Sequence, residues 1–154
     1  MAVSYAETVL NDGFWMRRAI DLSRRCPPAG SAYSVGAVIV DAGGVEIAYG
    51  YSRETDPLIH AEESALAKLG GSVPAGATLY STLEPCSMRA SRPVTCTELT
   101  LIAGIRRVVI AWREPSLFVA DCQGVELLRE AGVEVVELSH LANQARAVNN
   151  HLPV

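Results

Sequence analysis

The chain has 154 residues, of which 49% are hydrophobic and 19% charged, and its net charge is -4. This length suits one domain with a sizeable core, so we expect a single domain over residues 1–154. The acidic balance counts against a nucleic-acid partner, whose binding surface is normally basic. No apolar run is long enough to cross a bilayer. Because residues 1–10 include Glu7 and no basic cluster, we expect no export signal and a cytoplasmic location.

The first predicted element is an amphipathic helix over residues 6–25, where apolar side chains recur at helical spacing. The Cys26-Pro27-Pro28 segment ends this helix. Two short apolar runs follow at residues 35–40 and 45–51. The Asp-Ala-Gly-Gly turn between them predicts an antiparallel hairpin.

After the hairpin, predicted helices and strands alternate. The helices cover residues 61–69, 97–103, 124–131 and 141–149, and the strands cover residues 78–83, 108–112 and 133–137. This alternation is typical of parallel crossovers with helices on both faces of a sheet. The sequence therefore predicts an α/β protein with three α/β/α layers and a mixed sheet of about five strands, which begins with the antiparallel hairpin.

The most informative pattern consists of His60, Glu62, Cys86 and Cys96. One imidazole and two thiols leave the fourth position of a tetrahedral zinc ion open, which is typical of a catalytic site. The carboxylate two residues after the histidine is the proton carrier that a hydrolytic zinc site needs. The pattern is close to the H-x-E…P-C-x-x-C signature of zinc nucleobase deaminases. It departs from that signature because nine residues, rather than two, separate the cysteines.

The predicted elements place these residues where a site is expected. His60 and Glu62 open one helix, Cys86 follows a strand, and Cys96 stands immediately before another helix. In open α/β sheets, sites form where strands end and helices begin. Cys122 is the rival third ligand, and we interpret Cys26 as a structural thiol.

The pattern also predicts a mechanism. Neutral His60 and the thiolates of Cys86 and Cys96 would hold Zn²⁺, which lowers the pKa of a bound water toward about 7. Glu62 would take a proton from this water, protonate the ring nitrogen beside the reacting carbon, and pass a proton to the leaving ammonia.

Beyond these residues, the chain resembles the pyrimidine deaminases of riboflavin biosynthesis, within the cytidine deaminase superfamily. The resemblance covers nearly the whole length and is carried by residues 35–40, the His60-Ala61-Glu62 motif, residues 78–86, residues 103–109 and residues 128–135. The wide spacing between the cysteines also fits this family. Ser31-Ala32-Tyr33-Ser34 stands where bacterial bifunctional members carry an Asn-rich stretch, and is closer to the fungal, monofunctional deaminase type.

The resemblance implies a cytidine deaminase-like fold, a zinc cofactor, a homodimer or larger homo-oligomer, and a phosphorylated ribosylamino- or ribitylaminopyrimidinone as substrate. Cationic groups are needed to bind such a phosphate. Arg89 and Arg92 lie in the loop between the cysteines, and Arg53 precedes His60, so these three arginines are the candidates. Their other interpretation is as solvent-exposed loop arginines.

Three functions remain open. We favour a small-molecule deaminase, acting on the riboflavin pyrimidine or on another base, nucleoside or nucleotide of cytidine, deoxycytidylate or guanine type. A tRNA adenosine deaminase is the second, and the acidic balance and wide cysteine spacing count against it. A non-catalytic zinc-stabilised module is the third. Glu62 counts against it, because a structural site has no use for that carboxylate and normally has four protein ligands.

Overall fold

The computed structural model describes residues 3–118 and 121–153. A mixed sheet of five strands, in the order β2-β1-β3-β4-β5, forms its centre. The strands are β1 (Gly36–Val40), β2 (Glu46–Tyr51), β3 (Thr78–Leu83), β4 (Arg107–Trp112) and β5 (Glu134–Glu137). β1 pairs antiparallel with both β2 and β3, whereas β3, β4 and β5 run parallel to one another.

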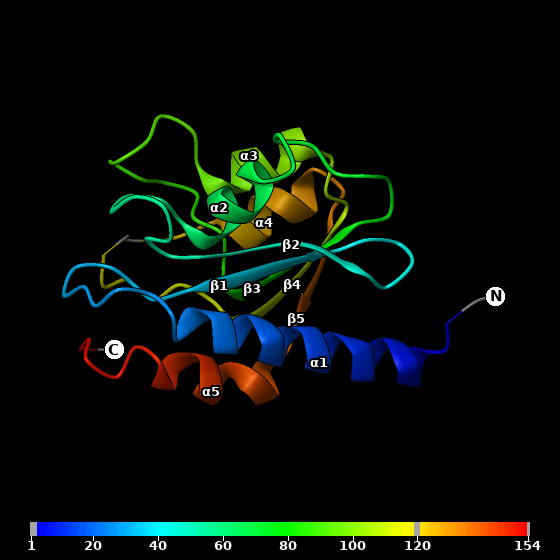
Figure 1. Cartoon of the computed structure of the whole chain (residues 1–154), viewed down its shortest axis with the longest axis horizontal. Helices are drawn as coiled ribbons and strands as arrows, with labels where there is room; N and C mark the ends of the chain where they lie inside the picture. Colours follow the sequence, from blue (N-terminus) through cyan, green and yellow to red (C-terminus); the bar gives the residue numbers. More distant parts are fainter. Residues whose placement is uncertain (1–2, 119–120, 154) are drawn as a thin grey trace.

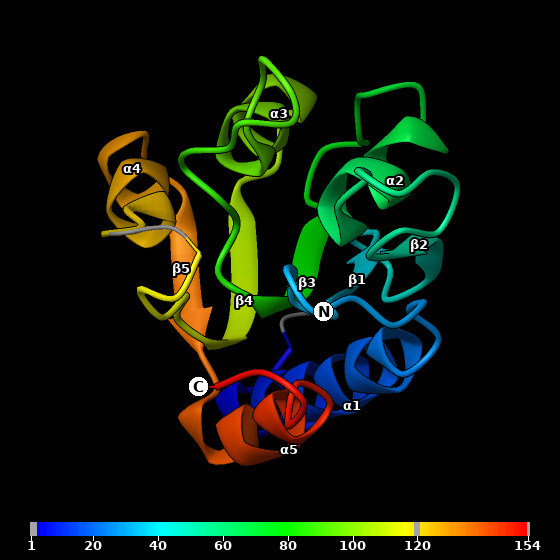
Figure 2. The ribbon, with the colours of Figure 1, turned by 90° about the vertical axis from the view of Figure 1, so that its left-hand side faces the viewer.

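Helices cover both faces of the sheet (Figures 1 and 2). One face carries α1 (Tyr5–Ser23) and α5 (Ala142–Ala147), which follows a short 3₁₀ helix, η1 (Ser139–Leu141). The other face carries α2 (Ala61–Ala67), α3 (Cys96–Ala103) and α4 (Gly124–Glu130). The predicted three-layer α/β/α fold is confirmed. None of the helices in the described ranges is both long and apolar enough to span a bilayer.

The inner strands are apolar because helices cover both of their faces. Every residue of β1 is buried, and so is every residue of β3 and β4 after the first. Strands buried on both faces need continuous apolar runs rather than alternation. The edge strand β2 instead mixes buried and half-buried positions.

Close backbone contacts bring α2 against the sheet. A Cβ atom at Gly50 of β2 would lie 2.3 Å from the carbonyl oxygen of Ala61, the first residue of α2. Only glycine permits this approach, which sets the position of the His60–Glu62 segment.

The start of α3 differs by one residue from the prediction. Cys96 is the first residue of the helix rather than the residue before it. The reason is a capping box, in which the Thr95 hydroxyl accepts the Glu98 N–H at 3.2 Å and the Glu98 carboxylate accepts the Thr95 N–H at 2.9 Å. Cys96 therefore presents to the site a backbone N–H that has no acceptor within the helix.

Candidate metal centre and pocket

His60, Cys86 and Cys96 meet at one end of the sheet, with their ligand atoms within 4.8 Å of one another. His60 is the N-cap of α2, Cys86 follows β3, and Cys96 begins α3. The His60 Nδ1 atom lies 3.6 Å from the Cys86 Sγ and 3.4 Å from the Cys96 Sγ. The Cys96 backbone N–H donates to the Cys86 Sγ at 3.3 Å. The sequence prediction that these three residues come together is thus matched by the geometry.

The chemistry of this donor set fits zinc. The hydrogen bond from the Cys96 thiol lowers the pKa of Cys86 to about 4, so that Cys86 carries the negative charge. The same contact and complete burial raise the pKa of Cys96 well above its usual value. Two buried thiols that share one negative charge and face an imidazole nitrogen are donors that a divalent cation can join. An imidazole and two thiols are the three protein ligands of an open, catalytic type of zinc site.

Cys122, the rival ligand, lies outside this cluster. Its Sγ atom is 3.7 Å from the Pro85 carbonyl oxygen and 3.8 Å from the Ser87 hydroxyl. Burial raises the pKa of Cys122 to about 12, so it stays a neutral thiol. Over the described ranges, the group with metal-binding geometry consists of His60, Cys86 and Cys96, and Cys122 does not belong to it.

Glu62 is buried beside the cluster, in the first turn of α2. Its Oε1 atom accepts a hydrogen bond from the Ser81 hydroxyl at 2.6 Å. Burial raises the pKa of Glu62, and the nearby Cys86 thiolate adds to the effect. A carboxyl group whose pKa lies above its ordinary value is suited to both accept and return a proton.

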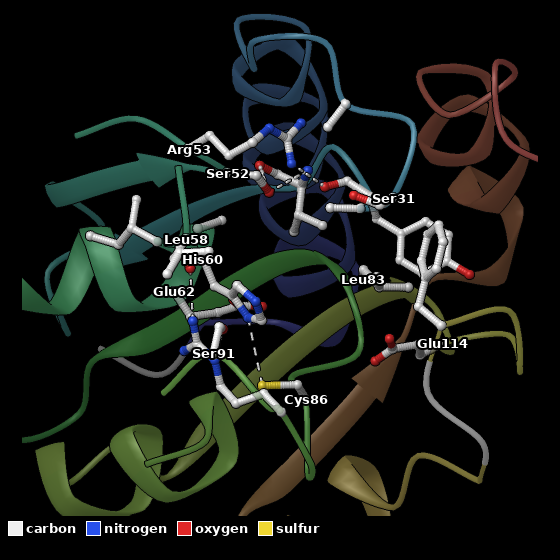
Figure 3. A pocket seen from close by; sticks show the side chains of 18 of the residues that line it. Ser31, Ser52, Arg53, Leu58, His60, Glu62, Leu83, Cys86, Ser91 and Glu114 are labelled. Carbon is white, nitrogen blue, oxygen red and sulfur yellow. Dashed lines mark hydrogen bonds between the residues drawn. The ribbon is translucent and has the colours of Figure 1, made fainter. Parts of the chain in front are cut away.

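A cavity of about 410 Å³ opens beside the cluster, and both His60 and Glu62 line it. Figure 3 shows Cys86 at one end of the cavity and Arg53 at the opposite end, close to Ser31 and Ser52. A ligand that fills the cavity therefore extends from the metal cluster toward Arg53.

Arg53 lines this cavity and has no carboxylate partner among the residues that the structure describes. Its guanidinium donates to the carbonyl oxygens of Pro27 and Tyr33, at 2.8–3.1 Å, and to the Ser34 hydroxyl at 3.1 Å. The backbone of Arg53 has a φ of +62°, which is uncommon for a residue other than glycine. Such a conformation persists where the surrounding contacts impose it.

Arg89 and Arg92 are placed differently. The Arg89 side chain is only 3% exposed, and its guanidinium donates to Glu63 Oε1 at 3.2 Å and to the Leu58 carbonyl oxygen at 2.8 Å. Arg92 pairs with Asp56 Oδ2 at 2.7 Å and, unlike Arg89, is not among the residues that line the cavity. The interpretation as a solvent-exposed arginine is therefore wrong for Arg89. Binding of phosphate by either residue stays a prediction, and both have a second role in holding the loop.

The sequence alone did not identify two acidic residues near the cavity. Glu84 follows β3 and is 3% exposed, and its two oxygens accept the backbone N–H groups of Glu114 at 3.1 Å and Val125 at 2.9 Å. Glu114 lies just after β4 and lines the cavity. Burial raises the pKa of Glu114 to about 7. The sequence did contain a signal for both residues. Each follows a buried strand of the parallel part of the sheet, and the carboxyl ends of such strands meet at the edge where sites form.

Together, the fold and the cluster define a zinc-binding deaminase domain. Residues 10–112 match the family described as the cytidine and deoxycytidylate deaminase zinc-binding region, and the chain belongs to this family. The predicted recognition and the zinc cofactor are confirmed at this level.

Individual relatives are described as pyrimidine deaminases or as riboflavin biosynthesis proteins. The chain is 41% identical over 145 residues to the diaminohydroxyphosphoribosylamino-pyrimidine deaminase of Schizosaccharomyces pombe, an alignment that covers 90% of this chain and 35% of the relative. It is 35% identical, with a TM-score of 0.73, to a Thermotoga maritima structure described as a diaminohydroxyphosphoribosylaminopyrimidine deaminase/5-amino-6-(5-phosphoribosylamino)uracil reductase, covering 90% of this chain and 39% of the other. The Aspergillus oryzae Rib2 deaminase shares the fold, with a TM-score of 0.78, 22% identity and 89% coverage of both chains. The chain thus spans about a third of the S. pombe relative.

Proposed function

We propose that the chain is a zinc-dependent hydrolytic deaminase of a small aminopyrimidine, and that its substrate is the phosphorylated diaminopyrimidinone of riboflavin biosynthesis. The observation that carries the proposal is the convergence of His60, Cys86 and Cys96 with the buried carboxyl of Glu62 on one cavity. In this proposal, the first three residues hold zinc and Glu62 moves protons. The name of the S. pombe relative supports the choice of a diaminopyrimidine.

The mechanism follows from the residues around the cavity. Zinc, when bound by His60, Cys86 and Cys96, supplies a Lewis acid that activates water. Glu62 accepts the proton of the attacking water and delivers it to the ring nitrogen beside the carbon that bears the amine. After the carbon–oxygen bond forms, Glu62 takes the remaining proton of the added hydroxyl and passes it to the amine nitrogen. The carbon–nitrogen bond then breaks, a carbonyl forms at the carbon, and the nitrogen leaves as ammonia. The Ser81 hydroxyl, 2.6 Å from Glu62 Oε1, keeps the carboxyl oriented through both transfers.

We assign the substrate phosphate to Arg53. Its guanidinium bonds only neutral acceptors in the described ranges, so its charge is available to an anion, whereas Arg89 is paired with Glu63. Arg53 and Cys86 lie at opposite ends of the cavity (Figure 3). This separation suits a substrate with the reacting amine at one end and the phosphate at the other.

Three further expectations from the sequence stay predictions: a single domain over residues 1–154, a homo-oligomer, and a cytoplasmic location. Light scattering would measure the oligomeric state, and cell fractionation would measure the location.

Ammonia release by the zinc-loaded chain tests the proposed function. We expect turnover of the phosphorylated diaminopyrimidinone to exceed turnover of its dephosphorylated form, cytidine, deoxycytidylate, guanine and adenosine. Faster turnover of one of the other compounds would contradict the proposed substrate, while the proposed deaminase activity would stand. Absence of ammonia from every compound, with zinc bound, would contradict the proposed activity.

A further inference from the structure

Glu114 is an acidic group in the cavity wall that no cation neutralises among the described residues. Its neighbour Arg113 pairs instead with Glu126 at 2.8 Å and Glu137 at 3.3 Å. The charged groups that act on Glu114 are themselves acidic, namely Cys86, Glu62 and Glu84. The Cys122 thiol donates a hydrogen bond to this half-buried carboxyl, and the two carboxyl oxygens can accept further hydrogen bonds from a ligand.

Glu84 holds Glu114 in this position. One oxygen of the buried Glu84 carboxylate accepts the backbone N–H of Glu114, and the other accepts the N–H of Val125 in α4. Both ends of the segment between β4 and α4 are therefore attached to the end of β3. Figure 3 shows the carboxyl of Glu114 turned toward the cavity, on the side away from Arg53.

An aromatic wall lies beside Glu114. Tyr33 and Phe118 both line the cavity, with ring centroids 5.1 Å apart, and Tyr33 also contacts the Trp112 ring at 5.8 Å. The buried Tyr33 hydroxyl has no hydrogen-bond partner in the described ranges. An apolar wall next to a carboxyl acceptor suits a flat heterocycle with a donor on its edge.

We propose that Glu114 is a specificity-determining residue that accepts a hydrogen bond from the ring amino group that deamination leaves in place. This inference rests on the proposed function. The second activity in the description of the T. maritima relative, a 5-amino-6-(5-phosphoribosylamino)uracil reductase, names a pyrimidine that keeps one such amino group. Cytosine-type bases carry a C–H at that ring position and offer no donor. Glu114 thus favours a diaminopyrimidine over a cytosine.

A binding experiment tests this role without turnover. The Glu62→Gln variant, loaded with zinc, is titrated calorimetrically with the phosphorylated diaminopyrimidinone and with an analogue that carries hydrogen in place of the retained amino group. We expect the parent compound to bind at least about 10-fold more tightly, as for a hydrogen bond to a charged group. Adding Glu114→Leu should remove this difference, and adding Glu114→Gln should reduce it. Adding Glu126→Gln, at an exposed acid of α4, is the matched control and should leave it unchanged.

Three results would overturn the inference. The difference between the two ligands could persist in both Glu114 variants, both ligands could weaken equally, or the parent compound could fail to bind before Glu114 is changed. Failure of the proposed function is seen separately, as absence of ammonia release by the chain with Glu62 intact.

Discussion

Glu62, Cys86, Cys96 and Glu114 are acidic groups gathered around one cluster and its cavity, and hydrogen bonds and burial together shift their pKa values. Only Cys86 has a lowered pKa, whereas the pKa values of the other three are raised. Each new negative charge there is opposed by those already present. A bound dication relieves this opposition, which ties metal binding to deprotonation of the thiols.

The ligand set can be tested by zinc content. We expect Cys96→Ala to lose most of the bound zinc, because the cluster then has only two ligands, while Cys122→Ala keeps it. Metal analysis of the purified variants gives the answer. Zinc retained in Cys96→Ala but lost in Cys122→Ala would reverse the assignment.

Glu62→Gln separates metal binding from proton transfer. The amide keeps the size of the side chain but cannot carry protons, so we expect normal zinc content and a loss of turnover on the order of 10²–10⁴-fold or more. Ammonia release and metal analysis on the same sample measure both quantities. Near-normal turnover would remove Glu62 from the mechanism.

Arg53→Gln should raise the KM for the phosphorylated substrate. A charged hydrogen bond contributes about 1.5–3 kcal/mol, which corresponds to roughly 10–150-fold. KM for the dephosphorylated form should change far less, because that form never used the charge. Arg89→Gln is the comparison, and we expect it to affect both forms equally because it loosens the loop held by Glu63. If Arg89→Gln instead raised KM for the phosphorylated form alone, Arg89 rather than Arg53 would be the phosphate-binding residue.

At the scale of elements, the site depends on where two short helices begin. α2 and α3 contain seven and eight residues, and their first turns supply Glu62 and Cys96. Apolar periodicity predicted both helices but placed the start of the 97–103 helix one residue late. The capping box consists of two hydrogen bonds between side chain and backbone of Thr95 and Glu98, and apolar periodicity does not report them.

On the other face of the sheet, α1 packs closely against Gly36 of β1. A Cβ at Gly36 would lie 1.9 Å from the Ala19 carbonyl oxygen, so Gly36→Ala must push α1 away from β1. We expect a loss of about 1–3 kcal/mol or more in the free energy of unfolding, as for other overpacked cores, measured by urea denaturation. Gly30→Ala is the control, because a Cβ there meets no atom within 4 Å. Equal stability of the two variants would refute this packing argument.

At the scale of the whole molecule, polar contacts fasten the helical layers to the sheet. Asp12 of α1 accepts from the Tyr80 hydroxyl of β3 at 2.7 Å and pairs with Arg107 of β4 at 2.7 Å. Asn149 accepts the Ser34 N–H at 2.7 Å and so ties the C-terminal segment to the chain just before β1. Ser34 also accepts a hydrogen bond from Arg53 of the cavity wall, so the contact with Asn149 reaches the edge of the site.

Glu114 makes overall stability depend on pH. Its folded pKa of about 7 lies above the ordinary carboxyl value of 4.5, so the folded chain binds the proton more tightly than the unfolded chain does. The stabilising effect of this protonation is present below the unfolded value and is lost as pH rises through the folded one. We therefore expect Glu114→Gln to gain on the order of 1–3 kcal/mol over the unchanged chain between pH 4.5 and pH 8, measured by denaturant unfolding. A pH-independent difference would contradict this.

The sequence by itself determined the α/β alternation and the residue types of the candidate site, namely one histidine, two cysteines and the carboxyl of Glu62, with Cys96 favoured over Cys122. Helical and strand periods are local, and ligand chemistry follows from residue type, so both can be read without coordinates. Only the tertiary structure decided which cysteine stays outside the cluster, which arginines already have carboxylate partners, and where Glu114 lies. Arg92 meets Asp56 across 36 positions, and Glu84 meets Glu114 across 30. Contacts at such separations arise from how strands and helices pack, and no local pattern of residues specifies them.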